Sequence, residues 1–226
     1  MRSAARTPWE VAHPGADLPL GEVHVWRAHA NRWSGSRGVL SVEEGARAAR
    51  FRFDLDRRRW IAARVLLRHV LARYLEVDPS ALELGATEDG RPVVLWPHDA
   101  AWLCFSISHA GGVALVAVAR GQRVGVDVEE VRPGLDVVAV AQRALGNEEA
   151  GDLARESEPC RTQKFFAMWT QEEARGKCRG TGLIEPDDER RRGPLDVAEL
   201  PMGDGYAAAL AVSERLHDVR CFLVDV

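Results

Sequence analysis

The feature that most restricts the fold of this chain is a six-residue run of strict alternation at 124–129, which reads Val-Gly-Val-Asp-Val-Glu. Successive side chains of a β-strand point to opposite faces. A strand here therefore places its three valines on one face and Gly125, Asp127 and Glu129 on the other. The valine face needs an apolar layer to cover it, and the opposite face brings two carboxylates to one place.

A second polar pattern occupies residues 169–183, WTQEEARGKCRGTGL. Glu173 and Lys177 are four residues apart in a segment with helical patterning, so they lie one above the other on one helix face. Of the 30 basic residues, only Lys164 and Lys177 are lysines, which suggests that position 177 requires a compact point charge. Taken alone, a surface Glu–Lys pair that stabilises the helix by roughly 0.3 kcal/mol is the simpler interpretation.

The composition predicts a soluble globular protein with one large or two small domains, since 226 residues are 46% hydrophobic and 28% charged. The first residues show no charged start followed by an apolar core, and the longest apolar run, 113–119, is too short to cross a bilayer. The four cysteines have no CxxC spacing, which argues against a zinc site or a disulfide framework. We therefore expect a cytoplasmic protein with no membrane association.

The net charge of −4 is unevenly distributed. Residues 1–73 hold 14 arginines against 7 acidic residues, a balance of +7 that leaves −11 for the remainder. The overall charge makes nucleic acid an unexpected partner, but the basic region can attract phosphates or an acidic protein. An ordinary solvated helix face explains these arginines equally well.

Hydrophobic spacing predicts helices over 56–76, 137–145 and 161–178. The segment Gly180-Thr181-Gly182 ends the third helix, because glycine can take the left-handed conformation that closes a helix. Strands are predicted over 23–26, 93–96, 206–212 and 220–226. A turn is expected at 88–92, a solvated loop at 186–193, and an antiparallel meander of three strands between 103 and 131. These elements describe an α+β chain whose two halves have a similar coarse order.

Four short motifs follow one another between about residues 40 and 185: GRP at 90–92, FSISH at 105–109, GVDVE at 125–129 and WTxxEAxxKxxGTGL at 169–183. Each alone is a weak signal. In this order they resemble the 4'-phosphopantetheinyl transferases of the Sfp type. The resemblance implies a pseudo-dimer of two similar α/β subdomains with the active site between them, divided here into residues 1–120 and 121–226.

The resemblance also implies the reaction. Such an enzyme moves the 4'-phosphopantetheine arm of coenzyme A to a serine of an acyl or peptidyl carrier protein, needs magnesium and releases adenosine 3',5'-bisphosphate. Asp127, Glu129 and Glu173 match the family's metal-binding acids, with Glu129 binding either directly or through water. Glu173 is in addition a candidate base for the attacking serine, and Lys177 matches the catalytic lysine. An internal pseudo-dimer makes a monomer the expected state. The resemblance also makes secondary metabolite biosynthesis the expected setting.

The same resemblance assigns coenzyme A ligands to three parts of the chain. Ser108 and His109 match the pair that contacts the nucleotide's phosphates, and Arg91 stands where the family has a basic residue near them. The arginines that resemble the 3'-phosphate ligands are Arg47, Arg50 and Arg59. The planar fork of arginine suits bidentate phosphate contacts.

One position departs from the family pattern, because Glu172 stands where the family has a lysine beside the metal-binding glutamate. This departure leaves open a non-catalytic homologue that binds coenzyme A or a carrier protein. An unrelated metal-dependent phosphohydrolase would explain the acids but not the GRP and FSISH motifs. A Ser–His hydrolase is disfavoured, since the chain has no GxSxG elbow.

Overall fold

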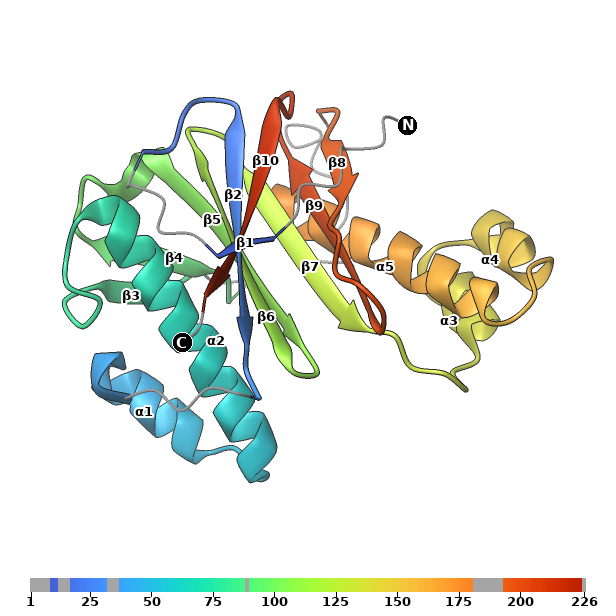
Figure 1. Cartoon of the computed structure of the whole chain (residues 1–226), viewed down its shortest axis with the longest axis horizontal. Helices are drawn as coiled ribbons and strands as arrows, with labels where there is room; N and C mark the ends of the chain where they lie inside the picture. Colours follow the sequence, from blue (N-terminus) through green and yellow to red (C-terminus); the bar gives the residue numbers. More distant parts are fainter. Residues whose placement is uncertain (1–8, 12–16, 32–36, 88–89, 181–192, 225–226) are drawn as a thin grey trace.

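The computed structural model describes residues 9–11, 17–31, 37–87, 90–180 and 193–224. Its main elements are two β-sheets and two long helices (Figure 1). The five-stranded sheet has the order β1 (Glu10–Val11), β10 (Asp218–Val224), β2 (Glu22–His29), β6 (Val113–Arg120) and β5 (Leu103–Ala110). The three-stranded sheet has the order β7 (Val124–Glu130), β9 (Tyr206–Val212) and β8 (Asp196–Glu199).

The two sheets pack face to face, and each carries a long helix on its outer side. Helix α2 (Asp54–Leu75) buries Leu66, Leu67 and Leu71 against one face of the five-stranded sheet. The other face of that sheet packs on the valine face of β7. Helix α5 (Cys160–Arg179) covers the far side of the three-stranded sheet, so the layers run helix, sheet, sheet, helix. This arrangement confirms the predicted α+β pseudo-dimer of two similar halves.

Both long helices follow from their sequences. α2 spans nearly the predicted range and ends at Glu76, which has a left-handed φ of 53°. α5 ends at Gly180, whose φ is 75° and whose N–H donates to the Gly176 carbonyl at 2.8 Å. The predicted glycine stop of α5 is therefore confirmed. The following motif residues, 181–183, lie outside the described residues.

The alternating segment folds as predicted, and its glycine sets the distance between β7 and α5. Val124, Val126 and Val128 lie in the core between the sheets. On the opposite face, a Cβ at Gly125 would overlap the Ala174 carbonyl oxygen and the Cys178 amide nitrogen of α5. Glycine is required here because the helix backbone lies directly on the strand. The helix that carries Glu173 and Lys177 is thereby held close to Asp127.

The predicted meander is only half correct. β5 and β6 pair antiparallel, but β7 leaves that sheet and pairs with β9. β10 crosses back in the other direction and pairs parallel with β2. Period-two alternation identifies a strand but not the sheet that it joins, since both sheets offer an apolar face to the valines.

The smaller elements complete the description. Helix α3 (Val137–Ala144) was predicted, whereas the eight-residue helices α1 (Val42–Ala49) and α4 (Asn147–Ala154) were not. The strands β3 (Glu83–Ala86) and β4 (Pro92–Trp96) form a separate antiparallel pair. The expected turn at 88–92 and loop at 186–193 fall partly outside the described residues. Among the described helices, none combines the length and the apolar character needed to cross a membrane.

Candidate active site between the two halves

The two halves meet where β5 of the first sheet lies beside β7 of the second. Two serine side chains of β5 bridge this seam. Ser106 Oγ accepts a hydrogen bond from the Val126 amide at 3.1 Å, and Ser108 Oγ accepts one from the Val128 amide at 3.4 Å. Hydroxyl groups thus satisfy main-chain donors of β7, and they fix its polar face relative to β5.

Three of the residues singled out from the sequence meet at this seam. Ser108 Oγ donates to Asp127 Oδ1 at 2.8 Å, and Lys177 Nζ donates to the same oxygen at 2.6 Å and to Ser108 Oγ at 3.0 Å. Asp127 is only 3% exposed, and its second oxygen, Oδ2, is buried without a hydrogen-bond partner in the described part of the chain. A buried oxygen left unpaired costs about 1–3 kcal/mol. This cost would be offset by a cation or a donor that binds Oδ2.

The other two acids lie close enough to respond to Asp127. The pKa of Glu173 is raised, first by burial and then by the negative charge of Asp127. The pKa of Glu129 is raised by the same two causes in the same order, although Arg132 and Lys177 oppose the rise. A cation among these carboxylates would relieve their mutual repulsion.

The donor set fits a hard divalent ion. Asp127, Glu129 and Glu173 offer only carboxylate oxygens, which are the ligands that magnesium prefers. Within the described residues, however, no group of three His, Cys, Asp or Glu side chains is gathered closely enough to hold a metal ion. The acids share an electrostatic field without converging on one point.

Lys177 does not form the surface pair with Glu173 that helix spacing alone allowed. Its ammonium group forms an ion pair with Asp127 across the α5–β7 interface, and its side chain is 30% exposed. No ion pair joins Lys177 to Glu173 among the described residues. The simpler interpretation of this lysine is therefore wrong, because its charge points into the seam.

His109 follows Ser108 but has an exposed side chain, as expected for adjacent residues of a strand. Its pKa is lowered by partial burial and then by the positive charge of Lys177. The imidazole is therefore biased toward its neutral form and lies within electrostatic reach of the lysine. Whether His109 contacts a phosphate stays a prediction.

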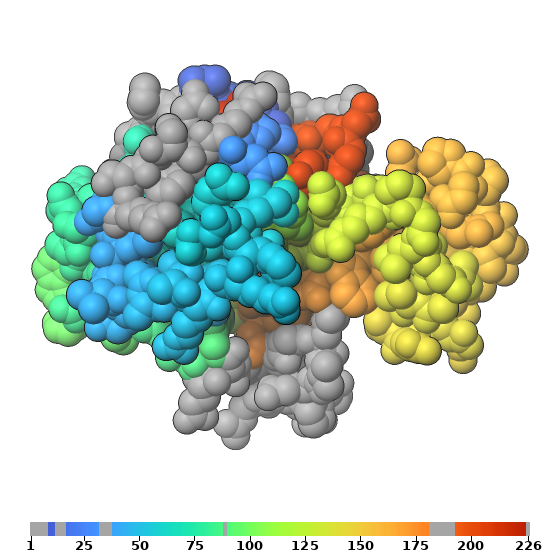
Figure 2. All heavy atoms as spheres, turned by 90° about the horizontal axis from the view of Figure 1, so that it is seen from below, coloured from blue at the N-terminus to red at the C-terminus, as the bar shows by residue number. Residues whose placement is uncertain are grey.

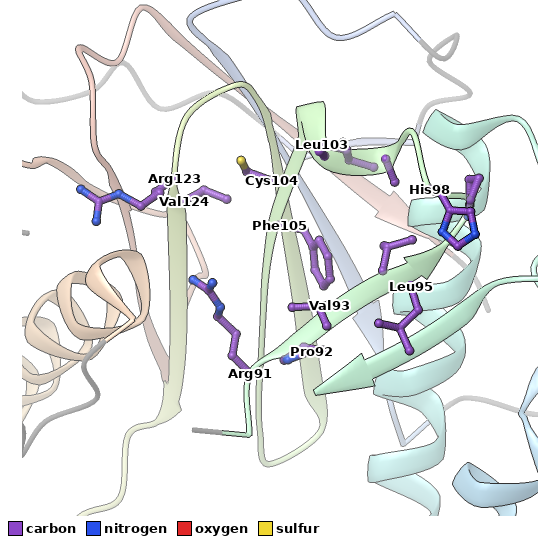
Figure 3. A pocket seen from close by; sticks show the side chains of 14 residues that line it. Arg91, Pro92, Val93, Leu95, His98, Leu103, Cys104, Phe105, Arg123 and Val124 are labelled. Atoms are coloured by element: carbon purple, nitrogen blue, oxygen red, sulfur yellow. The ribbon is translucent and has the colours of Figure 1, made fainter. Parts of the chain in front are cut away.

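Arg91 lies at a neighbouring cavity of about 480 Å³, formed by β4 and the first residues of β5 and β7 (Figure 3). Its side chain projects from the start of β4 toward β7, whereas Arg123 points away from the cavity. Burial raises the pKa of the Cys104 thiol, and the charges of Arg91 and Arg123 oppose that rise. The positive charge of Arg91 thus reaches the first residues of β5, on the cavity side of the seam.

The three arginines expected at the 3'-phosphate lie on the helical layer of the first half. Arg47 is exposed and stacks on the Trp60 ring at 5.4 Å, and Arg59 Nε donates to Asn31 Oδ1 at 3.0 Å. Arg50 is exposed at the end of α1. Figure 2 shows α1 and α2 at one end of a molecular face and α3 and α4 at the other. In the part of the chain that the structure describes, no hydrogen bond or ion pair joins these arginines to Asp127, so their assignment stays a prediction.

Glu172, the departure from the family pattern, points away from the seam. It is exposed, and its Oε1 accepts a hydrogen bond from Arg175 Nη1 at 2.7 Å. Its charge is thus paired on the outer surface of α5. The structure gives no sign that Glu172 disturbs the carboxylates beside it.

Sequence analysis missed Ser106 and Tyr206. Ser106 lies two residues before Ser108, so period two already placed both hydroxyls on one strand face. Tyr206 Oη accepts a hydrogen bond from the Gly112 amide at 3.0 Å across 94 residues of sequence. No local pattern in the sequence could have revealed the contact between Tyr206 and Gly112.

Comparison with known proteins agrees with this arrangement. Residues 24–121 match the family model for the N-terminal part of 4'-phosphopantetheinyl transferases, and residues 123–210 match that of the 4'-phosphopantetheinyl transferase superfamily. Two matched segments in tandem correspond to the two halves of the fold. The chain belongs to the 4'-phosphopantetheinyl transferases and is an enzyme of that class.

Individual relatives carry the same description. The chain is 31% identical to the 4'-phosphopantetheinyl transferase HetI of Nostoc sp. (strain PCC 7120) over 218 residues, which cover 94% of this chain and 90% of the relative. It is 34% identical to psf-1 of Bacillus pumilus over 64% of this chain and 59% of the relative. It is 30% identical to Sfp of Bacillus subtilis (strain 168) over 66% and 64%, respectively.

Proposed function

We propose that this transferase moves the 4'-phosphopantetheine arm of coenzyme A to a serine of an acyl or peptidyl carrier protein, depends on magnesium and releases adenosine 3',5'-bisphosphate. One observation carries the proposal. Asp127 is buried between the halves with one oxygen paired to Lys177 and Ser108, and the other unpaired. Family membership supports the transfer in general.

Asp127, Glu129 and Glu173 are the residues that would hold the metal ion. The unpaired Asp127 oxygen and the raised pKa values of the two glutamates all favour an added positive charge. When bound, magnesium would supply positive charge beside the pyrophosphate of coenzyme A. Glu129 serves this site directly or through a water molecule.

The bond broken is a phosphoanhydride, so the main tasks are positioning and charge neutralisation. The carrier serine oxygen forms a bond to the phosphorus on the pantetheine side, and the anhydride bond to adenosine 3',5'-bisphosphate breaks with its electron pair. Glu173 is the candidate acceptor of the serine proton, because its carboxylate lies within electrostatic reach of Asp127 and Lys177 at the seam. Lys177 stabilises the charge on the pyrophosphate or the leaving group.

The remaining assignments concern binding. Ser108, His109 and Arg91 would contact the phosphates, and Arg47, Arg50 and Arg59 the 3'-phosphate. The proposed division into residues 1–120 and 121–226 would place these ligands in the first part and the acids and the lysine in the second. Strand β10, at the end of the second part, nevertheless belongs to the five-stranded sheet of the first half. An acidic carrier would be steered by the basic first part of the chain. A monomeric state, a cytoplasmic location and a secondary-metabolite pathway stay predictions.

The decisive experiment is mass spectrometry of a carrier protein after incubation with coenzyme A and the enzyme. The proposal expects the carrier to gain one phosphopantetheine, adenosine 3',5'-bisphosphate to appear, and both to vanish with a chelator and return with magnesium. Undiminished transfer with the chelator would remove the metal from the proposal. An unchanged mass for acyl and peptidyl carriers alike would refute the acceptor class.

A separate experiment tests the 3'-phosphate assignment. Replacing Arg47 and Arg50 by glutamine should weaken the binding of coenzyme A more than that of dephospho-coenzyme A, which lacks the 3'-phosphate. Equal losses with the two substrates would mean that these arginines act on the carrier or on the fold.

A further inference from the structure

The turn between β5 and β6 lies two residues beyond His109 and is enclosed on both sides. Gly111 has a left-handed φ of 53°. A Cβ at Gly111 would come within 2.7 Å of Tyr206 Oη and 2.8 Å of the Glu130 carboxyl carbon, and one at Gly112 would overlap the Asn31 amide. Neither glycine can accept a side chain unless its neighbours move. The turn is therefore wedged between parts of the chain that are distant in sequence.

Tyr206 holds the turn from the second half of the molecule. It is the first residue of β9 and pairs with Glu130 at the end of β7. Its hydroxyl oxygen accepts the hydrogen bond of the Gly112 amide at 3.0 Å. Asp127 and Glu129 therefore lie on β7, which pairs with β9. The end of this strand pair contacts the turn that follows Ser108 and His109.

The main chain next to Asn31 holds the turn from the first half. The preceding residue, Ala30, donates its amide to the Gly112 carbonyl at 2.9 Å, which places the Asn31 side chain against Gly112. Asn31 Oδ1 also accepts a hydrogen bond from Arg59 Nε at 3.0 Å. One arginine of the expected 3'-phosphate set is thereby tied to the turn.

We propose that Tyr206 and Asn31 are positioning residues on opposite sides of the β5–β6 turn. The Tyr206 hydroxyl clamps the turn, whereas the Asn31 side chain, placed against the turn by the main-chain bond of Ala30, orients Arg59. Tyr206 fixes the end of β5 relative to β7, and hence Ser108 and His109 relative to the acids. Asn31 orients Arg59 relative to the same turn. The inference deepens the proposed function and rests on it for the identity of the ligand, coenzyme A.

The two roles differ in the part of coenzyme A that they affect. Tyr206 acts through Ser108 and His109 on the pyrophosphate, which dephospho-coenzyme A also has. Asn31 acts through Arg59 on the 3'-phosphate, which dephospho-coenzyme A lacks. Each substitution therefore has its own pattern with the two ligands. A general loss of stability would not produce the Asn31 pattern, and a destabilised control variant separates it from the Tyr206 pattern.

The chain offers a matched control, because it contains only two tyrosines. The hydroxyl of Tyr74 accepts a hydrogen bond from Trp26 Nε1 at 3.1 Å in the core below α2, away from the seam. Calorimetry should show the Kd of coenzyme A and that of dephospho-coenzyme A both rising about fivefold in Tyr206→Phe, the scale of one lost hydrogen bond. Tyr74→Phe should lower the melting temperature and leave both Kd values unchanged.

Asn31→Ala should raise the Kd of coenzyme A and leave that of dephospho-coenzyme A unchanged. In a His109→Ala background, the effect of Tyr206→Phe on Kd should shrink, since both changes act on the end of β5. Full additivity in that cycle, or equal weakening of both ligands by Asn31→Ala, would overturn the corresponding positioning role.

Amide hydrogen exchange tests the clamp without any ligand. Exchange over residues 109–113 should be faster in Tyr206→Phe than in the wild type and unchanged in Tyr74→Phe. Unchanged exchange there would overturn the clamp even if binding changed. A wild-type enzyme that binds no coenzyme A would instead refute the proposed function, while the exchange result would still decide whether the clamp exists.

Discussion

Two buried carboxylates of this molecule, Glu44 in the first half and Asp127 at the seam, differ in how well their oxygens are hydrogen-bonded. Burial by itself would raise the pKa of Glu44, but bonds from Ser41, Arg64 and Arg68 outweigh it and leave the pKa lowered. Glu44 Oε2 accepts from the Ser41 amide at 2.9 Å and from Arg68 Nε at 2.7 Å, and Arg64 binds Oε1. Both oxygens of Glu44 are thus paired.

Asp127 differs in that, among the residues that the structure describes, only one of its oxygens has a partner, and two further acids nearby have raised pKa values. A satisfied buried carboxylate stabilises the structure that surrounds it, whereas a half-satisfied one among other acids stores unfavourable energy. We infer that the first network serves the fold and the second serves a ligand. Substitutions in the two places should therefore affect different measurements.

The largest expected effect is on transfer in Asp127→Ala. Loss of the proposed metal ligand and of the partner of Lys177 should lower turnover by at least about 10³-fold. The fold should persist, because the removed carboxylate is already half unpaired. A transfer assay and circular dichroism of the same preparation measure both outcomes. Normal turnover by the folded variant would exclude Asp127 from the metal site.

Glu44→Ala should show the reverse pattern. Removing this carboxylate leaves Arg68, which is 1% exposed, as a buried charge without its anionic partner. Breaking such a pair costs about 3–5 kcal/mol of unfolding free energy, measurable by urea denaturation. The exposed neighbour Glu43 is the control, and Glu43→Ala should leave stability nearly unchanged. Equal losses in the two variants would contradict the network.

Lys177→Ala should lower turnover by about 10²–10³-fold, the scale for one preorganised charge contact. Lys177→Arg should not restore it fully, because a guanidinium cannot replace a compact ammonium beside Asp127. The other lysine supplies the control, since Lys164 pairs with Glu156 on the surface. If Lys177→Ala behaves like Lys164→Ala in steady-state kinetics, the catalytic role of Lys177 is wrong.

The same contrast explains which parts of the fold the sequence could predict. Alternation at 124–129 and four-residue spacing at 173–177 are local patterns, and they correctly placed the acids on one strand face and the lysine on a helix. Glu44, by contrast, was not recognised, because its partners Arg64 and Arg68 are 20 and 24 residues away on another helix. Periodicity within one segment does not reveal an ion pair between two helices.

The failures concern long-range partners. β7 was expected beside β6, but its valines pack between the sheets and it pairs with β9, over 70 residues later. The Tyr206–Gly112 contact depends on that same choice of sheet. The periodicity of a strand does not indicate which sheet the strand will join. The site residues could therefore be named from motifs, whereas the contacts that hold them could not.

The loss of folding stability at acid pH should depend on Glu44. Its folded-state pKa lies below the ordinary value of 4.5, so its contribution is fully present above that value and is lost as the pH falls through the folded pKa. Thermal unfolding between about pH 6 and pH 3 should therefore show a steeper decline in the wild type than in Glu44→Gln. Parallel curves for the two proteins would mean that another carboxylate governs this loss.

The smallest expected effect is a gain of stability at the seam. Without metal, Glu173 is held near Asp127 with a raised pKa, so its charge is unfavourable in the folded state. Glu173→Gln should therefore increase the unfolding free energy at neutral pH by about 0.5 kcal/mol, a small value because the side chain is partly exposed and screened. Glu172→Gln, one residue earlier, should instead lower stability slightly, since Glu172 pairs with Arg175. A gain of unfolding free energy in Glu173→Gln and a loss in Glu172→Gln would show that the two glutamates of one helix lie in different environments. A loss in both variants would mean that Glu173, like Glu44, has partners that stabilise its charge.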